Sequence, residues 1–276
     1  MPTPPALQRA SGTLRVGMRQ RDGATVLADL RQEGCLKARL PRPERGGWTS
    51  IITLNCSGGV AQGDTLTTRI EAAANTRLTV ASQAAERYYP APRRDLSARP
   101  ATIRTSLTAG ADAALEWLPQ ETILFDGCTL DRRLDIDLAE NAWFLGVETL
   151  VFGRALMGET VHQARIRDTI RLHRAGRLVW HDAIRLDGAV QDALDRPALA
   201  AGGRAVATLL HAAPDSAGAL DALRAALAPY EAGASAFDGL LVARIVARDG
   251  ACARAAVVAG LAVLRGDRPL PRVWIC

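Results

Sequence analysis

The fold of this chain is constrained most by two neighbouring segments. The first has the pattern of a strand with one solvent-exposed face, and the second, which follows closely, is a near-continuous apolar run. Within residues 130–138 the even-numbered positions are apolar and the odd-numbered ones are charged, which is the period of a half-exposed β-strand. Arg132 is the one charged residue on the apolar side. Residues 143–152 (WFLGVETLVF) form a near-continuous apolar run, which indicates a strand buried on both faces.

Glu148 lies in the middle of that buried run. A carboxylate on a buried strand is costly unless it is paired or hydrogen-bonded. We therefore expect Glu148 either to have a structural partner, such as Arg132 or Arg154, or to be kept for a function.

Similar alternating segments recur along the chain and are separated by turn-forming residues, so the chain is predicted to be mainly β. We predict about fifteen short strands and two α-helices near the C-terminus, over 217–227 and 251–264. The β-rich part covers 12–196, and after residue 197 strands alternate with the helices. Length alone does not decide between one domain and two.

Composition and local patterns narrow the class of protein. The net charge is +5, but charges of both signs are scattered and aromatic residues make up only 4% of the chain, so we expect no nucleic-acid partner. Residues 1–12 lack the pattern of a secretory signal, and no run is long enough to span a bilayer. We expect a cytoplasmic protein without membrane attachment.

The common catalytic motifs are missing from the sequence. There is no GxSxG, no GxxxxGK[ST], and the four histidines form no HxH or HExxH pattern. One enzymatic alternative remains, a β-rich hydrolase that uses Glu121 and Asp126 as general acid and base. Asp126-Gly127 fits a hairpin turn better, and Glu121 fits a loop or the start of a strand after Pro119.

Two consecutive strand patterns, 161–173 and 178–186, form a predicted hairpin with a basic face. Its arginines alternate with apolar residues: Arg165, Arg167, Arg171 and Arg185. This face is either solvated or a docking surface for an acidic partner. A β-rich adaptor for such a partner is therefore a further functional hypothesis.

Four longer segments carry a more specific signal. These are LNCSGGVAQGD at 54–64, SQAAERYY at 82–89, WLPQETILFDG at 117–127 and LVFGRALMGE at 150–159. In this order and spacing they resemble the hallmark segments of the urease accessory protein UreD family, called UreH in some species. The resemblance spans about two-thirds of the chain, and the C-terminal region matches only in character.

The resemblance implies a single UreD-type domain over 1–276, folded as an irregular helix-like stack of strands with two helices. It also implies a non-enzymatic maturation factor that joins UreF and the GTPase UreG and delivers nickel into apo-urease. Nickel would then be in transit, with no cofactor bound tightly. An internal passage lined by oxygen ligands would suit this task, because carboxylates release a divalent ion more readily than a closed Cys/His cage does.

Three carboxylates within the matched segments are the candidates for nickel transit: Asp64, Glu86 and Glu148. Each also has a structural reading, since Asp64 can cap its glycine-rich loop and Glu86 can pair with Arg87. For contact with a partner protein, the candidates are Arg154, Met157 and Glu159. They lie on a polar, methionine-bearing loop after the buried strand, which suits an interface.

Overall fold

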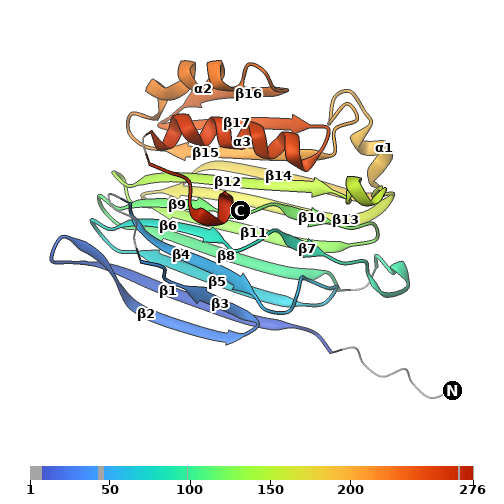
Figure 1. The fold of residues 1–276 in the computed structure, drawn as a ribbon, viewed down its shortest axis with the longest axis horizontal. Coiled ribbons are helices and arrows are strands. Elements are labelled where there is room, and N and C mark those ends of the chain that lie inside the picture. Colours follow the sequence, from blue (N-terminus) through green and yellow to red (C-terminus); the bar gives the residue numbers. More distant parts are fainter. Residues whose placement is uncertain (1–7, 43–46, 98, 267, 276) are drawn as a thin grey trace.

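The computed structural model describes residues 8–42, 47–97, 99–266 and 268–275, which form two stacked β-sheets (Figure 1). Sheet A has seven strands in the order β14-β13-β11-β8-β5-β1-β2. Their bounds are β1 (Ser11–Arg21), β2 (Ala24–Gly34), β5 (Thr65–Ala72), β8 (Ala101–Ala109), β11 (Thr129–Leu138), β13 (Gln163–Arg174) and β14 (Arg177–Ala189).

Sheet B has ten strands, of which eight follow the order β16-β17-β15-β12-β9-β6-β4-β3, while β10 pairs with β12 and β7. Their bounds are β3 (Leu36–Arg39), β4 (Thr49–Asn55), β6 (Arg77–Ser82), β7 (Glu86–Tyr88), β9 (Ala114–Leu118), β10 (Thr122–Leu124), β12 (Trp143–Phe152), β15 (Ala205–Ala212), β16 (Ala232–Phe237) and β17 (Leu240–Ala247).

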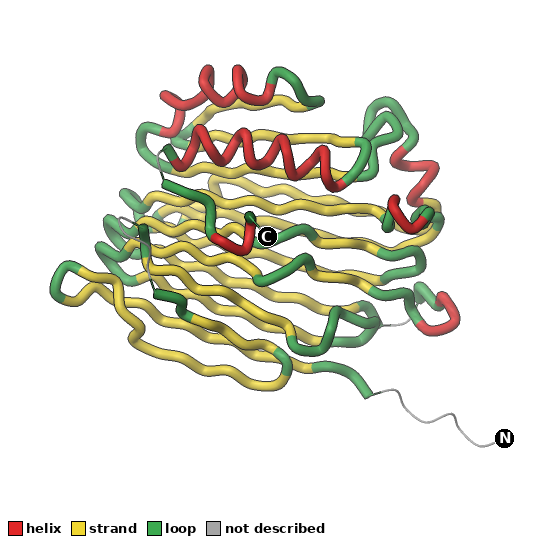
Figure 2. Tube along the Cα trace, in the orientation of Figure 1, coloured by secondary structure: helices red, strands yellow, loops and turns green. Residues whose placement is uncertain are grey.

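The chain coils between the two sheets as it advances (Figure 2). From β5 to β13 the long strands lie alternately in sheet A and sheet B, and each pairs in parallel with the strand one coil earlier. Hairpins of antiparallel strands, β1–β2 and β13–β14, lie at the two ends of sheet A. The prediction of a mainly β, helix-like stack is confirmed.

The strands predicted over residues 130–138 and 143–152 are also confirmed. In β11 the even-numbered side chains point into the molecule, and Leu134 and Ile136 are buried. In β12 both faces are buried, because sheet A covers one face and α3 (Gly250–Arg265) contacts the other.

The two predicted C-terminal helices correspond to α2 (Leu220–Leu227) and α3. The α3 helix begins after Asp249, whose side chain accepts a hydrogen bond from the amide of Cys252 at 2.8 Å and so caps the helix. The structure adds a five-residue helix, α1 (Val190–Leu194), and β16, whose sequence AGASAF lacks the β-branched residues typical of strands. In the described ranges, no helix is both long and apolar enough to cross a membrane.

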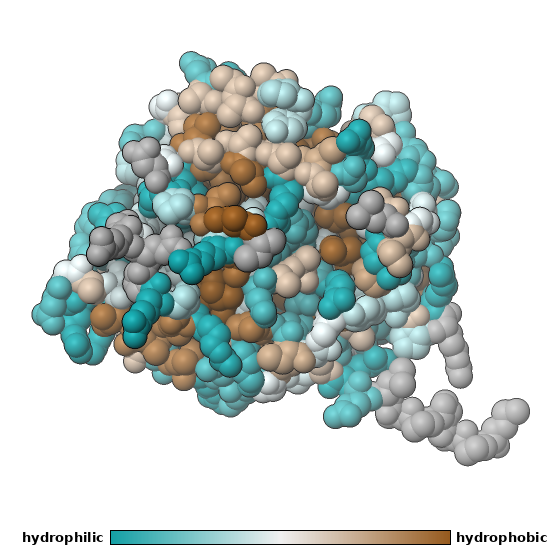
Figure 3. Space-filling view, viewed as in Figure 1, coloured by the Kyte–Doolittle hydropathy of each residue, from teal (hydrophilic) through white to brown (hydrophobic). Residues whose placement is uncertain are grey.

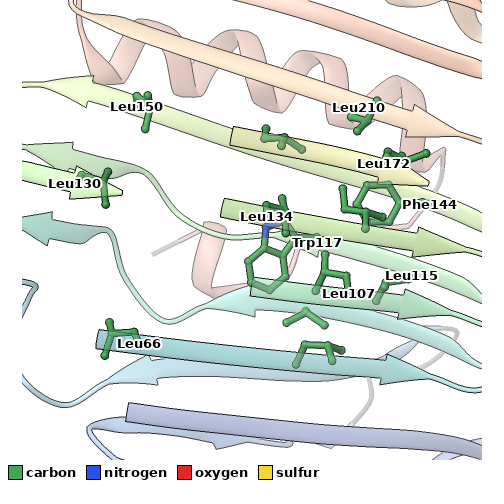
Figure 4. Close-up of a cluster of buried hydrophobic side chains, with 14 of the residues drawn as sticks. Leu66, Leu107, Leu115, Trp117, Leu130, Leu134, Phe144, Leu150, Leu172 and Leu210 are labelled. Carbon is green, nitrogen blue, oxygen red and sulfur yellow. The ribbon is translucent and has the colours of Figure 1, made fainter. Parts of the chain in front are cut away.

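The main hydrophobic core lies between the two sheets (Figure 4). Leu107 and Leu134 from sheet A meet Leu115 and Phe144 from sheet B there, and all four are buried. A second core lies on the outer face of sheet B, where α3 packs over β15 and β17 and α2 packs against α3 and β16. The sheets are thus separated by an apolar layer, so any polar group between them needs a partner.

The C-terminal segment after α3 returns across the outer face of sheet B, where hydrophobic side chains gather around it (Figure 3). The indole nitrogen of Trp274 donates a 3.0 Å hydrogen bond to the carbonyl of Leu118 in β9. In the same strand Glu116 is fully buried and contacts Arg265 and Arg268. Residues 268–275 therefore cover the outer face of sheet B at β9.

Candidate functional site

A cavity of about 350 Å³ interrupts the apolar layer between the sheets. Glu86 and Glu148 both line it, although they belong to β7 and β12. The other polar groups in its wall include Asn55, Gln120 and Arg132. The structure thus brings two of the three predicted transit carboxylates to the wall of one cavity.

Glu148 is held at the inner end of this cavity by two donors. The indole nitrogen of Trp117 donates to Oε1 at 2.7 Å, and Nη1 of Arg132 lies 2.8 Å from Oε2. Burial raises the pKa of Glu148 above its ordinary value, although the charge of Arg132 acts in the opposite direction. Arg132 is therefore the partner of Glu148, one of the two arginines that the sequence suggested.

Arg132 also explains why a charged residue occupies the apolar side of β11. Its Nε and Nη2 atoms contact the two carboxylate oxygens of Asp168 in β13 at 2.8 and 2.6 Å. Nη1 donates a further 2.9 Å hydrogen bond to the hydroxyl of Thr122. One guanidinium thus joins three neighbouring strands, β10, β11 and β13, to Glu148 on β12.

Glu86 lies nearer the glycine-rich loop, where the amide nitrogen of Asn55 donates a 3.1 Å hydrogen bond to its Oε2. Burial raises its pKa to about 7, and the nearby charge of Asp64 adds to this rise, while Arg87 lowers it only in part. A carboxylate that exchanges protons near neutral pH can trade its proton for a metal ion.

Asp64 has a different environment from the other two carboxylates. Oδ1 accepts a hydrogen bond from the amide of Ala10 and Oδ2 accepts one from the amide of Ala61, both at 2.8 Å. The side chain is buried, and it fixes the loop that ends at residue 64 against the start of β1. This geometry agrees with a structural role for Asp64, in which its side chain caps its own glycine-rich loop.

The polar interior continues beyond Glu148 toward the other end of the sheets. A small pocket of about 10 Å³ is lined by Glu148, Asp168, Asp182 and Thr208, among others. Asp182 in β14 forms an ion pair with Arg244 in β17. Glu148 therefore borders both the large cavity and this small pocket.

The two carboxylates of the hydrolase hypothesis, Glu121 and Asp126, belong to different hydrogen-bond networks. Oε1 of Glu121 accepts a 2.8 Å hydrogen bond from Arg254 of α3. Asp126 pairs with Arg94, and its Oδ1 accepts a 2.8 Å hydrogen bond from the amide of Gln163. Each carboxylate is thus engaged in holding a loop or a helix in place.

The predicted partner-binding loop follows β12 and contains a short 3-10 turn, Ala155–Met157. Nε of Arg154 donates to Glu159 at 2.7 Å, and its guanidinium lies 4.1 Å from the ring centroid of Phe125. Met157 is 74% exposed. The ion pair thus fixes a loop that presents a large apolar side chain to solvent.

The basic hairpin is confirmed as β13 and β14, but its neighbours carry the opposite charge. Arg171 forms a 2.6 Å ion pair with Asp135 of β11. In the adjacent strand pair, Arg104 lies 3.1 Å from Asp131. The outer face of sheet A is therefore a mixed-charge surface.

Within the described residues, no three His, Cys, Asp or Glu side chains are grouped closely enough to hold a metal ion. The arrangement between the sheets consists instead of separate carboxylates along a polar row. Sequence reasoning missed Asp168 and Trp117. Asp168 could have been found, because it is a charged residue in the apolar row of its strand, as Arg132 is in its own.

Comparison with known proteins agrees with the resemblance in the four sequence segments. The UreD urease accessory protein family model matches residues 10–275. A urease accessory protein UreD from Methylobacterium sp. (strain 4-46) is 45% identical over 99% of this chain and 98% of the relative. That from Rhizobium leguminosarum bv. trifolii (strain WSM2304) is 42% identical over 97% of this chain and 96% of the relative.

These names describe accessory proteins of urease, in agreement with the expectation that the chain is not an enzyme. The match extends through the C-terminal helices, which the sequence segments had left out. The chain belongs to the UreD family of urease accessory proteins.

Proposed function

We propose that this chain acts in urease maturation together with UreF and the GTPase UreG, and that nickel passes through its inter-sheet cavity on the way to apo-urease. The observation that carries the proposal is the shared cavity of Glu86 and Glu148. Two strands distant in sequence place their carboxylates in one internal space, where a hydrophobic core would otherwise be expected.

The chemistry of these side chains supports transit rather than storage. Carboxylate oxygens bind a borderline divalent ion less tightly than a cage of thiolate and imidazole ligands does. The pKa of about 7 at Glu86 lets a proton leave when the ion binds and return when it moves on. Asp64 contributes only by fixing its loop, because both of its oxygens accept backbone amides.

The test is nickel insertion in cells that lack the native protein and receive this chain or a variant. Glu86→Gln and Glu148→Gln keep the side-chain shape and remove the charge, so we expect each to lower urease nickel content at least fivefold. Glu121→Gln is the matched control, because Glu121 is partly buried but pairs with Arg254 outside the cavity wall.

Each variant must still pull down UreF, so that loss of nickel is separated from loss of assembly. Normal nickel content with both cavity variants would remove the passage from the proposal. Failure of the unchanged chain to activate urease would remove the maturation role as well.

The exposed loop around Met157 is the proposed partner surface. Met157→Glu should abolish the pull-down of UreF, because it places a charge where an apolar contact is expected. Leu178→Glu is the control, since Leu178 is also an exposed large apolar residue, at 50%, but lies in β14 of the basic hairpin. Equal binding by both variants would exclude the Met157 loop as the UreF contact.

A further inference from the structure

The cluster around Arg132 forms a wall across the polar interior. On one side lies the cavity of about 350 Å³, and on the other lies the pocket of about 10 Å³ that Asp168 and Asp182 line. The side chains of Arg132 and Glu148 are 11% and 12% exposed, so little space is left around them. A cation that enters the cavity therefore meets a fixed guanidinium before it can reach the far pocket.

The two carboxylates in this wall are held unequally. Arg132 binds Asp168 with two nitrogen–oxygen contacts, at 2.8 and 2.6 Å, in the planar geometry that suits a guanidinium. It binds Glu148 through Nη1 alone, at 2.8 Å, and the same atom also donates to Thr122. Glu148 is thus the partner that Arg132 can release while it remains attached to Asp168.

Glu148 would not move far after such a release, because Trp117 still donates to its other oxygen at 2.7 Å. The freed Oε2 atom would face the cavity without its arginine partner. An oxygen ligand of that kind suits a divalent cation, whereas the closed arrangement repels one through the positive guanidinium.

We propose that Arg132 is the gate of the inter-sheet passage, closing it by occupying Glu148 and opening it by releasing Glu148 while it keeps its hold on Asp168. The inference deepens the proposed function and rests on it for the identity of the cation. Arg132 then has a positioning role: it decides when Glu148 is available.

The test measures Ni²⁺ binding to the purified full-length chain by equilibrium dialysis at neutral pH. Arg132→Met removes the guanidinium, so Ni²⁺ should bind at least tenfold more tightly than to the unchanged chain. The gain should vanish in the double variant Arg132→Met/Glu148→Gln. If Arg132→Met does not fold, Arg132→Gln carries the same expectation, because it also removes the positive guanidinium, while its polar amide suits the buried site better than a thioether does.

Arg244→Met is the matched control, since it removes another arginine between the sheets, one that pairs with Asp182 and leaves Glu148 held. Quenching of Trp117 fluorescence by Ni²⁺, isolated by comparison with Trp117→Phe variants, should appear with Arg132→Met and not with Arg244→Met. A merely structural Arg132 would give no such signal.

An unchanged Ni²⁺ affinity in both Arg132 variants would overturn the gate, and so would an equal gain with Arg244→Met. The nickel passage and the Arg132 gate can be rejected independently, because the Ni²⁺ binding assay contains no urease. A gain with Arg132→Met alongside normal urease activation by both Glu86→Gln and Glu148→Gln would reject the passage, whereas the opposite pattern would reject only the gate.

Discussion

Glu116 of β9 and Arg265 of α3 form a doubly hydrogen-bonded ion pair in the interior, although 149 residues separate them in the sequence. Their two contacts measure 2.9 and 3.0 Å, and the side chains are 0% and 5% exposed. The hydroxyl of Thr79 donates to the same carboxylate at 2.6 Å. This pair fastens the last long helix to the outer face of sheet B.

Removal of one partner should be strongly destabilising, because it leaves a buried charge with less compensation. We expect Arg265→Met to lower the free energy of unfolding by about 3 kcal/mol in urea titrations. The double variant Glu116→Met/Arg265→Met should recover much of that loss. Arg31→Met is the control, since its pair with Glu33 is exposed, and a cost equal to that of Arg265→Met would contradict the argument.

Glu86 should make the protein less stable as the pH rises. Its pKa is about 7 in the folded chain, against an ordinary 4.5 when unfolded, so between these values the folded state holds a proton that the unfolded state has lost. The resulting loss of folding free energy grows as the pH rises from 4.5 to 7. Above pH 7 it is complete, at about 3 kcal/mol. Urea unfolding at pH 4.5 and pH 8 should show Glu86→Gln gaining stability over the unchanged chain only at pH 8.

His211 should have the opposite dependence. It is buried beside Trp143, with ring centroids 5.1 Å apart, and neither ring nitrogen has a hydrogen-bond partner among the described residues. Burial lowers its pKa to about 4, so the unfolded state takes up a proton first as the pH falls below 6.5.

Stability should therefore be highest above pH 6.5 and should decline toward pH 4 because of this residue. His211→Phe should flatten the decline in the midpoint of thermal unfolding over that range. His181→Phe should leave it unchanged, because His181 is exposed. An unaltered slope in His211→Phe would show that other groups cause the decline.

Asp64→Ala should act on stability and leave nickel insertion intact. It removes the acceptor of two backbone amides, so the free energy of unfolding should fall by about 2 kcal/mol. Urease activation should stay normal once the amounts of folded protein are matched. Loss of nickel at matched protein levels would instead place Asp64 on the transit route.

The sequence predicted the strands well where one strand could be recognised on its own. The alternation in 130–138 and the apolar run in 143–152 are local patterns, and both strands formed as expected. The pairing between coils is not local, so nothing in the sequence placed Asp168 opposite Arg132. Their register in β11 and β13 depends on the whole stack.

The same limit applies to the candidate site. Glu86 and Glu148 were predicted as separate carboxylates, and only the stacking of β7, β10 and β12 brings them to one cavity. The helix predicted over 217–227 begins later, at Leu220, because a 3-10 turn occupies Ser216–Ala219. The single domain over 1–276 stays a prediction, and residues 1–7, which entered the expectation about a leader, lie outside the described residues.

The C-terminal segment also has a consequence for synthesis of the protein. Arg265, Arg268 and Trp274 can reach β9 only after α3 and the segment that follows it have been made. While the ribosome still holds these residues, Glu116 lies on an uncovered apolar sheet without its counter-ions. The nascent chain therefore exposes this apolar face until α3 and the residues after it have docked, and a chaperone or partner would protect it during that time.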